Sequence, residues 1–332
     1  MEYRNLNKKD NILIIDGFNN FIRAYIANPT LTTNGEAVGG TAGFLRILQK
    51  YCNELNPSRI FICWDGVGGS IRRKSLFSEY KANRNPARLN RFTESTSENE
   101  EERNKIWQMT RLLQYLENFP VTQLNCEYVE ADDLIAWLCM NMTDDNTHAY
   151  VISNDKDFVQ LVNENVTVYR PTSEEKLTTD EVMRIYGIHP NNFCLAKAIC
   201  GDTSDNVPGI KGAGFKTLAK RLPQFALPDK LRLDTLLDLC ETASTVKKAP
   251  KVFQDILNGS DIVERNLELL CLLDTDLSDN AKRKILYDID NGLPYFNRIS
   301  LFGMFNEDGI SGIKWDGLFS WSQNTIARRR KK

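Results

Sequence analysis

The sequence lacks the residue types on which nucleophilic and zinc enzymes often depend. Its 332 residues include only two histidines, His148 in a polar turn and His189 before a proline, and we expect both at the surface. The eight cysteines form no CxxC pair, and Cys63 and Cys139 lie inside apolar runs. This pattern is typical of reduced, buried thiols, so nothing supports a disulfide, a zinc site or a histidine-based triad.

Long apolar runs are also absent. The N-terminus, MEYRNLNKKDN, has no apolar signal core, and no run approaches the ~20 residues that a membrane span needs. We therefore expect a cytoplasmic protein without membrane contact. With 42% hydrophobic residues the chain can bury a large core, as one domain or two coupled lobes. A net charge of −2 argues against a nucleic-acid partner only if the charges are evenly spread.

Short apolar runs alternate with segments of helical periodicity. The runs at 11–16, 59–65, 148–155 and 165–169 have the length and β-branched content of buried parallel strands. Helical periodicity marks residues 41–55, 104–119 and 132–142. This alternation predicts a doubly wound α/β fold, with a mostly parallel, twisted sheet flanked by helices.

Three of the predicted strands end in aspartate. Asp16, Asp65 and Asp155 stand at these ends, and Asp157 follows two residues after the last. A single aspartate at a strand end is most often a turn or a helix cap. Three of them at the carboxyl edge of a parallel sheet, where ligands bind in such folds, favour a shared site.

The segment EADD adds Glu130, Asp132 and Asp133 at the start of a predicted helix. Taken alone, acidic residues in a first helical turn are explained by the helix dipole. Their convergence with the aspartates at the strand ends favours hard divalent cations, Mg²⁺ or Mn²⁺, because oxygen ligands suit these ions.

Two further segments indicate contact with phosphates. Residues 201–222 carry a glycine-rich turn after Asp202 and Asp205, and any helix–turn–helix corner can carry such glycines. Residues 70–92 hold seven basic side chains against Glu79, with aromatic rings interleaved, which is typical of a single-strand path or of a solvated helix face. The basic residues of these two segments are Arg72, Arg73, Lys74, Lys81, Arg84, Arg88 and Arg91, and Lys211, Lys216, Lys220 and Arg221.

Together these stretches resemble the 5′-nuclease (flap endonuclease) family. The motifs IIDG, WD, EYKANR, EADD, NDKDF and GDTSDNVPGIKGAGFKT occur in the order of that family over residues 11–222. The last of them is similar to the 5′-nuclease domain of bacterial DNA polymerase I. Residues 263–305 resemble the ribonuclease H of T-even-type phages, which implies a phage origin and the host-cell cytoplasm.

The resemblance implies two Mg²⁺ ions, with Mn²⁺ as a substitute, and a monovalent cation at the Gly209–Gly214 hairpin. The first metal would be surrounded by Asp16, Asp65, Glu130 and Asp132, and the second by Asp132, Asp155, Asp157 and Asp205, with Asp133 and Asp202 acting through waters. The 35 acidic residues that are not among these nine ligands are outnumbered by 42 basic ones. A basic surface around an acidic crevice suits a nuclease.

Roles in nucleic-acid binding follow from the same resemblance. Lys81 and Arg84 would contact the scissile phosphate, and Tyr80 would stack on a base. The residues expected to bind DNA are Arg72, Arg73, Tyr80, Gly209, Lys211, Gly212, Gly214, Lys216 and Thr217. Arg72 and Ser78 depart from the family pattern. This departure affects the expected contacts at the entrance of the arch and not the expected chemistry.

The expected organisation is an α/β nuclease core over residues 1–180 with a helical arch at about 70–105. A helical DNA-binding lobe at 181–315 would contain a helix–three-turn–helix motif at about 195–222, and the basic tail 316–332 would be disordered.

The implied function is a monomeric 5′-3′ exonuclease or flap endonuclease that acts on DNA flaps, 5′ overhangs and RNA–DNA hybrids, with ribonuclease H activity. Its task would be the removal of RNA primers or flaps in lagging-strand replication, beside a single-strand binding protein or a clamp. The alternatives are a junction-binding protein without catalysis and a metal-dependent phosphatase.

Overall fold

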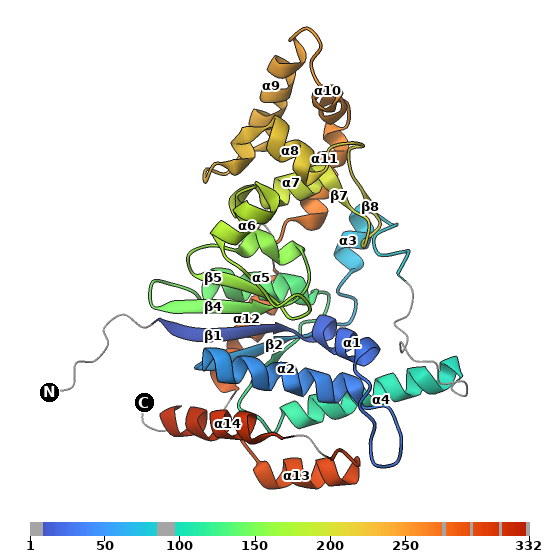
Figure 1. Cartoon of the computed structure of the whole chain (residues 1–332), viewed down its shortest axis with the longest axis vertical. Coiled ribbons are helices and arrows are strands. Elements are labelled where there is room, and N and C mark those ends of the chain that lie inside the picture. Colours follow the sequence, from blue (N-terminus) through green and yellow to red (C-terminus); the bar gives the residue numbers. More distant parts are fainter. Residues whose placement is uncertain (1–8, 85–96, 274–276, 293–294, 312–313, 330–332) are drawn as a thin grey trace, which may run out of the picture.

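The computed structural model describes residues 9–84, 97–273, 277–292, 295–311 and 314–329. Its centre is a six-stranded sheet in the order β3-β2-β1-β4-β5-β6, parallel except for β6 (Figure 1). The strands are β1 (Asp10–Asp16), β2 (Arg59–Cys63), β3 (Thr122–Leu124), β4 (Thr147–Ile152), β5 (Val166–Arg170) and β6 (Glu175–Leu177). The four predicted strands are confirmed. The three-residue strands β3 and β6 were missed because they are too short to show a pattern.

Both faces of the sheet are covered, which explains why its strands are continuously apolar. Ile12 and Ile14 of β1 pack into one core with α5 (Ala131–Asn141), whereas Leu13 and Ile15 pack into a second core on the other face. That second core includes side chains of α1 (Gly17–Ala27), α2 (Gly39–Leu55) and α4 (Glu98–Leu116). The predicted mostly parallel sheet flanked by helices is therefore confirmed.

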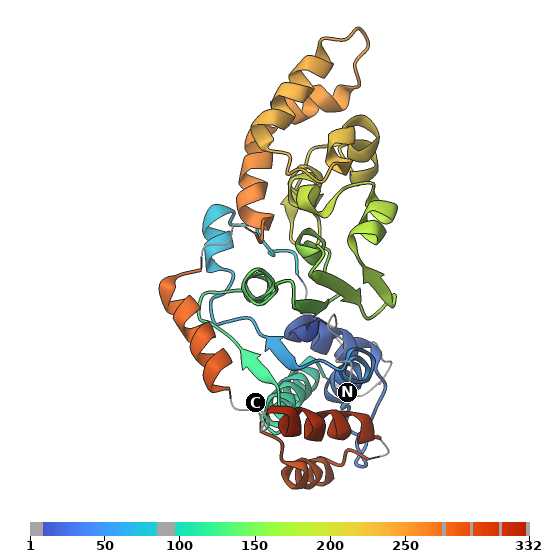
Figure 2. The same cartoon turned by 90° about the vertical axis from the view of Figure 1, so that its left-hand side faces the viewer.

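A helical lobe follows the sheet and rises above it (Figure 2). Its helices are α6 (Thr179–Tyr186), α7 (Phe193–Cys200), α8 (Phe215–Arg221), α9 (Leu233–Ser244), α10 (Lys251–Asn258) and α11 (Ser260–Leu270). The two-stranded hairpin β7 (Gly201–Asp202) and β8 (Val207–Pro208) lies between α7 and α8. The end of α11 returns to the core beside α3 (Ile71–Leu76).

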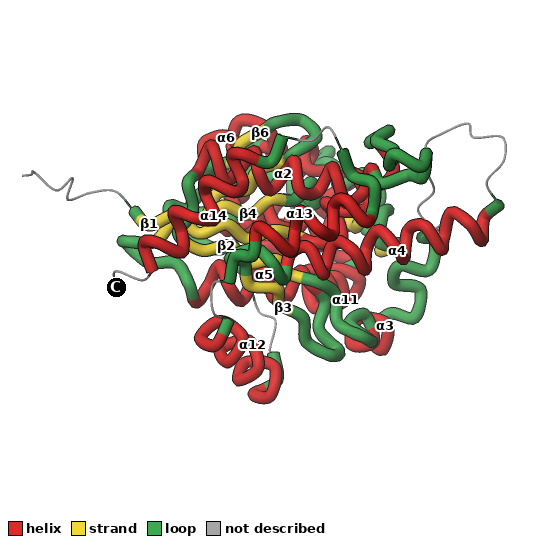
Figure 3. The backbone as a smooth tube through the Cα atoms, turned by 90° about the horizontal axis from the view of Figure 1, so that it is seen from below, coloured by secondary structure: helices red, strands yellow, loops and turns green. Residues whose placement is uncertain are grey.

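The chain ends in three helices, α12 (Asp279–Asn291), α13 (Arg298–Glu307) and α14 (Asp316–Arg329). Figure 3 shows α13 and α14 beneath the sheet. Leu318, Phe319 and Trp321 are buried in the second core, and the Trp321 indole donates a hydrogen bond of 3.0 Å to the Pro57 carbonyl. The expected disorder of the tail is therefore wrong for residues 316–329, because their apolar side chains form a helix that packs onto α2.

Part of the predicted arch lies outside the described residues. Helices α3 and α4 flank residues 85–96, which include Arg88 and Arg91. All eight cysteines are free and seven are buried, as expected, whereas His148 and His189 are partly buried rather than fully exposed. Within the described residues no helix has the length and apolar character needed to cross a membrane.

Candidate metal centre and nucleic-acid interface

Asp16 occupies the carboxyl end of β1, next to the point where the strand order changes direction between β1 and β4. It caps α1 by accepting a 3.1 Å hydrogen bond from the Asn19 amide, and the Ser153 hydroxyl donates to its other oxygen at 2.9 Å. Only 5% of Asp16 is exposed. Burial, and then the negative charges of Asp155 and Asp65, raise the pKa of Asp16 to about 7.

Asp65, Asp132 and Asp155 belong to the same group, and Asp155 lies close enough to raise the pKa of both Asp16 and Asp132. Asp65 lies just after β2 and accepts a 2.8 Å hydrogen bond from the Ala131 amide, which ties the loop after β2 to the start of α5. Asp132 stands in the first turn of α5, where burial and the charge of Asp155 raise its pKa well above the usual value. Like charges held this close repel one another, and a bound cation would relieve that repulsion.

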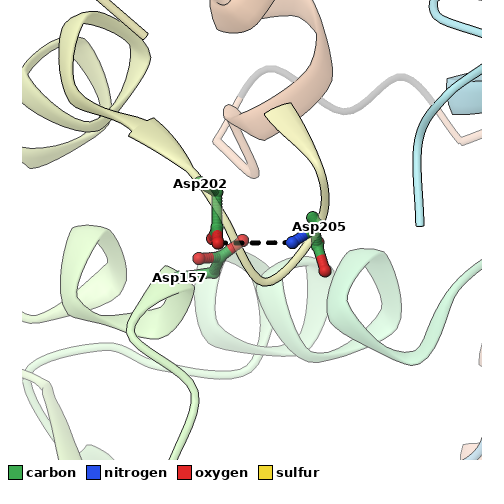
Figure 4. Close-up of side chains that lie close together, drawn as sticks. All are labelled: Asp157, Asp202 and Asp205. Carbon is green, nitrogen blue, oxygen red and sulfur yellow. Dashed lines mark hydrogen bonds between the residues drawn. The ribbon is translucent and has the colours of Figure 1, made fainter. Parts of the chain in front are cut away.

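A second group of carboxylates lies where the core meets the helical lobe. Oxygens of Asp157, Asp202 and Asp205 lie within 4.8 Å of one another (Figure 4). Asp157 follows β4 and begins a short 3₁₀ helix, Asp157–Leu161, whereas the other two stand on the β7–β8 hairpin. Asp202 thus belongs directly to this group, although the resemblance gave it only an outer role.

Lys197 is a residue of this group that the sequence reasoning missed. It lies on α7, is 3% exposed, and its ammonium group pairs with Asp157 and, at 2.8 Å, with Asp202. Burial alone would raise the pKa of Asp202, but the charge and hydrogen bonds of Lys197, with those of Ser204, lower it to about 2. The available signal was a lysine inside the apolar stretch CLAKAIC, because a buried lysine requires a partner.

Arg73 is buried among the EADD carboxylates and is not offered to DNA. Its guanidinium donates to both oxygens of Asp133 at 2.6 and 2.9 Å, to Glu130 at 2.6 Å and to the Leu269 carbonyl at 2.9 Å. Only 2% of Arg73 is exposed. This corrects its expected role in DNA binding: Arg73 joins α3, α5 and α11 and neutralises two of the carboxylates.

Tyr80 is also enclosed, which corrects the expectation that it stacks on a base. Its ring packs against Val207, Leu269 and Leu270 with 2% exposure, and its hydroxyl donates to Glu130 at 3.2 Å. Both oxygens of Glu130 are therefore bonded within the protein, since Lys81 donates to the other at 2.8 Å.

Lys81 and Arg84 connect the segment after α3 to the carboxylates of the site. The Lys81 amide donates to the Asp205 carbonyl at 2.9 Å, and Arg84 pairs with the Asp205 carboxylate. Burial would lower the pKa of Lys81, but the charges of Asp132, Glu130 and Asp205 raise it, so the ammonium stays charged. Arg72 differs from Arg73, because its side chain is 42% exposed and lies 4.0 Å from Asp133.

The glycines of the hairpin divide into two kinds. A Cβ on Gly209 would lie 2.1 Å from the Cys200 carbonyl, so Gly209 is required by packing. Gly212 and Gly214 face open space, and Gly212 has a φ of +82°. Lys211 and Lys216 are exposed beside them, and Thr217 is partly buried. Helix packing therefore does not account for the two open glycines, and the surface there is accessible to a phosphate backbone.

The donor set fits hard divalent cations. The two groups offer carboxylate oxygens alone, without a histidine or thiolate, which is the preference of Mg²⁺ and Mn²⁺. Burial first, and then neighbouring carboxylates, raise the pKa of Asp16 and of Asp132, and a bound cation would favour their ionised forms.

Comparison with known proteins identifies the family. Residues 11–187 match the family model of the 5′-3′ exonuclease N-terminal, resolvase-like domain. A 5′-3′ exonuclease of Buchnera aphidicola subsp. Schizaphis graminum is 30% identical over 222 residues, covering 66% of this chain and 72% of that protein. The DNA polymerase I of Bacillus subtilis is 30% identical over 233 residues, covering 68% of this chain and 24% of the polymerase.

Solved structures agree with the fold. The bacteriophage T5 D15 flap endonuclease (D155K), in a complex with DNA and metal ions, matches with a TM-score of 0.60 at 20% identity, covering 96% of this chain and 98% of that chain. The zinc-bound T5 5′-exonuclease matches with a TM-score of 0.61 at 19% identity over 96% and 98% of the two chains. The chain belongs to the 5′-3′ exonuclease family. It is a nuclease, and its carboxylate groups offer oxygen ligands that could hold a divalent metal ion.

Proposed function

We propose that the chain is a structure-specific 5′-nuclease that hydrolyses phosphodiesters at junctions of single-stranded and duplex nucleic acid. The observation that carries the proposal is the pair of adjoining carboxylate groups, one built by the sheet edge and the other shared with the β7–β8 hairpin. The open surface at Gly212 and Gly214 lies on the same chain segment as Asp202 and Asp205. The junction would bind where the core meets the lobe.

Asp16, Asp65, Asp132 and Asp155 would hold one divalent cation, and Asp157, Asp202 and Asp205 would hold the other. This differs from the assignment that the resemblance implied, because both oxygens of Glu130 are bonded within the protein and Asp202 lies beside Asp157 and Asp205. When bound, Mg²⁺ or Mn²⁺ ions in such a pair lower the pKa of a water molecule and neutralise charge on the leaving oxygen. Hydrolysis of the bond between the phosphorus and the 3′ oxygen leaves a 5′-phosphate on the product.

The cations of the protein complete the site. Lys81 and Arg84 stand beside Asp205 and place positive charge where the scissile phosphate would approach. Arg73 holds Glu130 and Asp133 in place through α3, α5 and α11. Lys211 and Lys216, beside the open glycines, would neutralise phosphates of one duplex strand, and a monovalent cation at this hairpin would contribute in the same way.

The substrates would be 5′ flaps, 5′ overhangs and RNA–DNA hybrids, so that the biological task is removal of RNA primers or flaps in lagging-strand replication. The same proposal includes ribonuclease H activity and a monomeric protein in the cytoplasm. It also includes contact with a single-strand binding protein or a clamp. The core, the helical lobe and the arch at about residues 70–105 divide this work into chemistry, duplex binding and strand guidance.

The proposal is tested with end-labelled flap DNA in Mg²⁺ and in EDTA. Wild type should cut near the junction only with Mg²⁺, and Asp155→Asn should lose cleavage while it binds the junction normally. The control is Asp145→Asn, an exposed carboxylate in the turn before β4. Junction binding without cleavage by wild type would instead favour a binding protein, and hydrolysis of phosphomonoesters alone would favour a phosphatase.

A further inference from the structure

Tyr128 stands beside the metal centre in an unfavourable backbone conformation. Its φ is +62°, in the left-handed region where a bulky side chain is strained and a glycine is not. Its amide donates a 2.8 Å hydrogen bond to the Val67 carbonyl, which joins the loop after β2 to the segment before α5. The protein thus maintains a tyrosine at a position whose backbone favours glycine.

The side chain of Tyr128 is not part of the core. It is 64% exposed, and its neighbours Val67 and Ile71 are 83% and 54% exposed. The ring lies against Gly68, where an added Cβ would be 2.9 Å from both the Tyr128 ring and Ile71. These three apolar side chains form one exposed ridge, which we call the Tyr128 ridge.

The Tyr128 ridge adjoins Asp65, one of the carboxylates of the first group. A cavity of about 610 Å³ is lined by Asp65, Val67, Tyr128 and Lys284, among others. Asp65 also binds the Ala131 amide at the start of α5, so the ridge and the acidic edge share one loop. Lys284, on α12, is exposed at this cavity and pairs with Asp288 at 2.5 Å.

Neither packing nor hydrogen bonding explains why a tyrosine occupies this position. The exposed ring adds little to the core, and among the described residues no hydrogen bond holds its hydroxyl. Backbone strain at a surface position is typically retained where it serves binding or catalysis. An exposed aromatic ring beside a phosphodiester-cleaving site has the chemistry to stack on a nucleobase, whatever the sequence.

We propose that Tyr128 is a stacking platform for one nucleobase of the strand that is cut, with Val67 at the edge of the platform. Lys284 lines the cavity beside this platform, where its positive charge would pair with the phosphate next to the stacked base. This assignment rests on the proposed nuclease function, because it takes the strand at the carboxylates as its occupant.

The decisive variant is Tyr128→Gly, because it removes the ring and relieves the backbone strain together. We expect its melting temperature to equal or exceed that of wild type, while affinity for flap DNA falls roughly 5- to 150-fold, the range for loss of one stacked base. Tyr128→Phe should bind as wild type, since stacking needs the ring and not the hydroxyl.

Asn56→Gly is the matched control. Asn56 has a φ of +44° at the end of α2, before β2 and so at the opposite edge of the sheet from the carboxylates. Relief of strain there should leave DNA affinity unchanged. Flap substrates with a single abasic site at successive positions identify the stacked base. At one position the missing base should lower the DNA affinity of wild type but not that of Tyr128→Gly.

The outcomes separate this proposal from the one on which it rests. If wild type neither cuts nor binds flap DNA, the proposed function fails first. If wild type cuts flaps but Tyr128→Gly binds and cuts them equally well, the stacking platform alone is refuted. A Tyr128→Gly protein that melts earlier and regains normal affinity below its melting range would show that the ring serves the fold only.

Discussion

Asp16→Asn is expected to stabilise the metal-free protein and to abolish its nuclease activity. The carboxylate of Asp16 is crowded by burial and by the charges of Asp155 and Asp65, which raise its pKa from 3.8 to about 7. Because the unfolded chain releases this proton at a lower pH than the folded protein, ionisation favours unfolding. Stability is therefore lost as the pH rises from about 4 towards 7, and the loss is complete above the folded pKa.

The magnitude follows from the shift. About three pKa units correspond to roughly 4 kcal/mol of lost stability at pH 8. Asparagine removes this cost, and the shift to about 7 already includes the hydrogen bonds that the carboxylate accepts from Asn19 and Ser153. The expectation is a gain of up to about 4 kcal/mol at pH 8 in EDTA, which falls to about 2 kcal/mol at pH 5 and disappears near pH 4.

Urea unfolding of wild type and Asp16→Asn at pH 5 and pH 8, in EDTA and in Mg²⁺, measures the free energy of unfolding and its dependence on pH and metal. Added Mg²⁺ should stabilise wild type much more than Asp16→Asn, because the variant lacks one ligand charge. A variant that is less stable than wild type at pH 8 in EDTA, or equally altered at both pH values, would refute the electrostatic reasoning.

Three further substitutions test other parts of the site. Lys81→Ala should lower the single-turnover cleavage rate roughly 10²- to 10³-fold with little change in duplex affinity; an unchanged rate would contradict its role at the phosphate. Gly214→Val should weaken duplex binding and flatten its salt dependence without lowering the melting temperature, since the space there is open. Lys197→Met should destabilise the metal-free protein by about 2 kcal/mol at pH 7 and less as the pH falls towards 2, measured by unfolding in EDTA.

The acidic edge of the sheet could be predicted because the geometry of parallel strands determines it. Strands that run in one direction present their carboxyl ends at one edge, so Asp16, Asp65 and Asp155 had to converge once the three strands were recognised. The order of the strands needed the structure, because short apolar runs do not determine which strands pair. The direct place of Asp202 beside Asp157 and Asp205 also needed it, because it depends on how the lobe docks against the core.

The basic segment could not be resolved in the same way. Arg72 and Arg73 are neighbours in sequence, yet one side chain is 42% exposed and the other 2%. Their difference depends on the rotation of α3 against α5 and α11, which a six-residue helix does not reveal through its periodicity. Tyr80 was misjudged for a related reason, since an aromatic between charged residues suits a buried anchor as well as a stacking surface.

Three cations lie among the carboxylates: Arg73 and Lys197 are buried, and Lys81 is partly buried. Arg73 grips Asp133 through two hydrogen bonds in a planar fork, so it is fixed in one orientation. Lys81 and Lys197 are point charges on flexible side chains. Lys81 pairs with Glu130, beside the first carboxylate group, and Lys197 pairs with Asp202 of the second. A lysine can leave such a pair by rotating its stem, whereas removal of Arg73 would break the links between three helices. The arginine therefore keeps the carboxylates in position, whereas the two lysines balance carboxylate charge and can be displaced by an arriving cation.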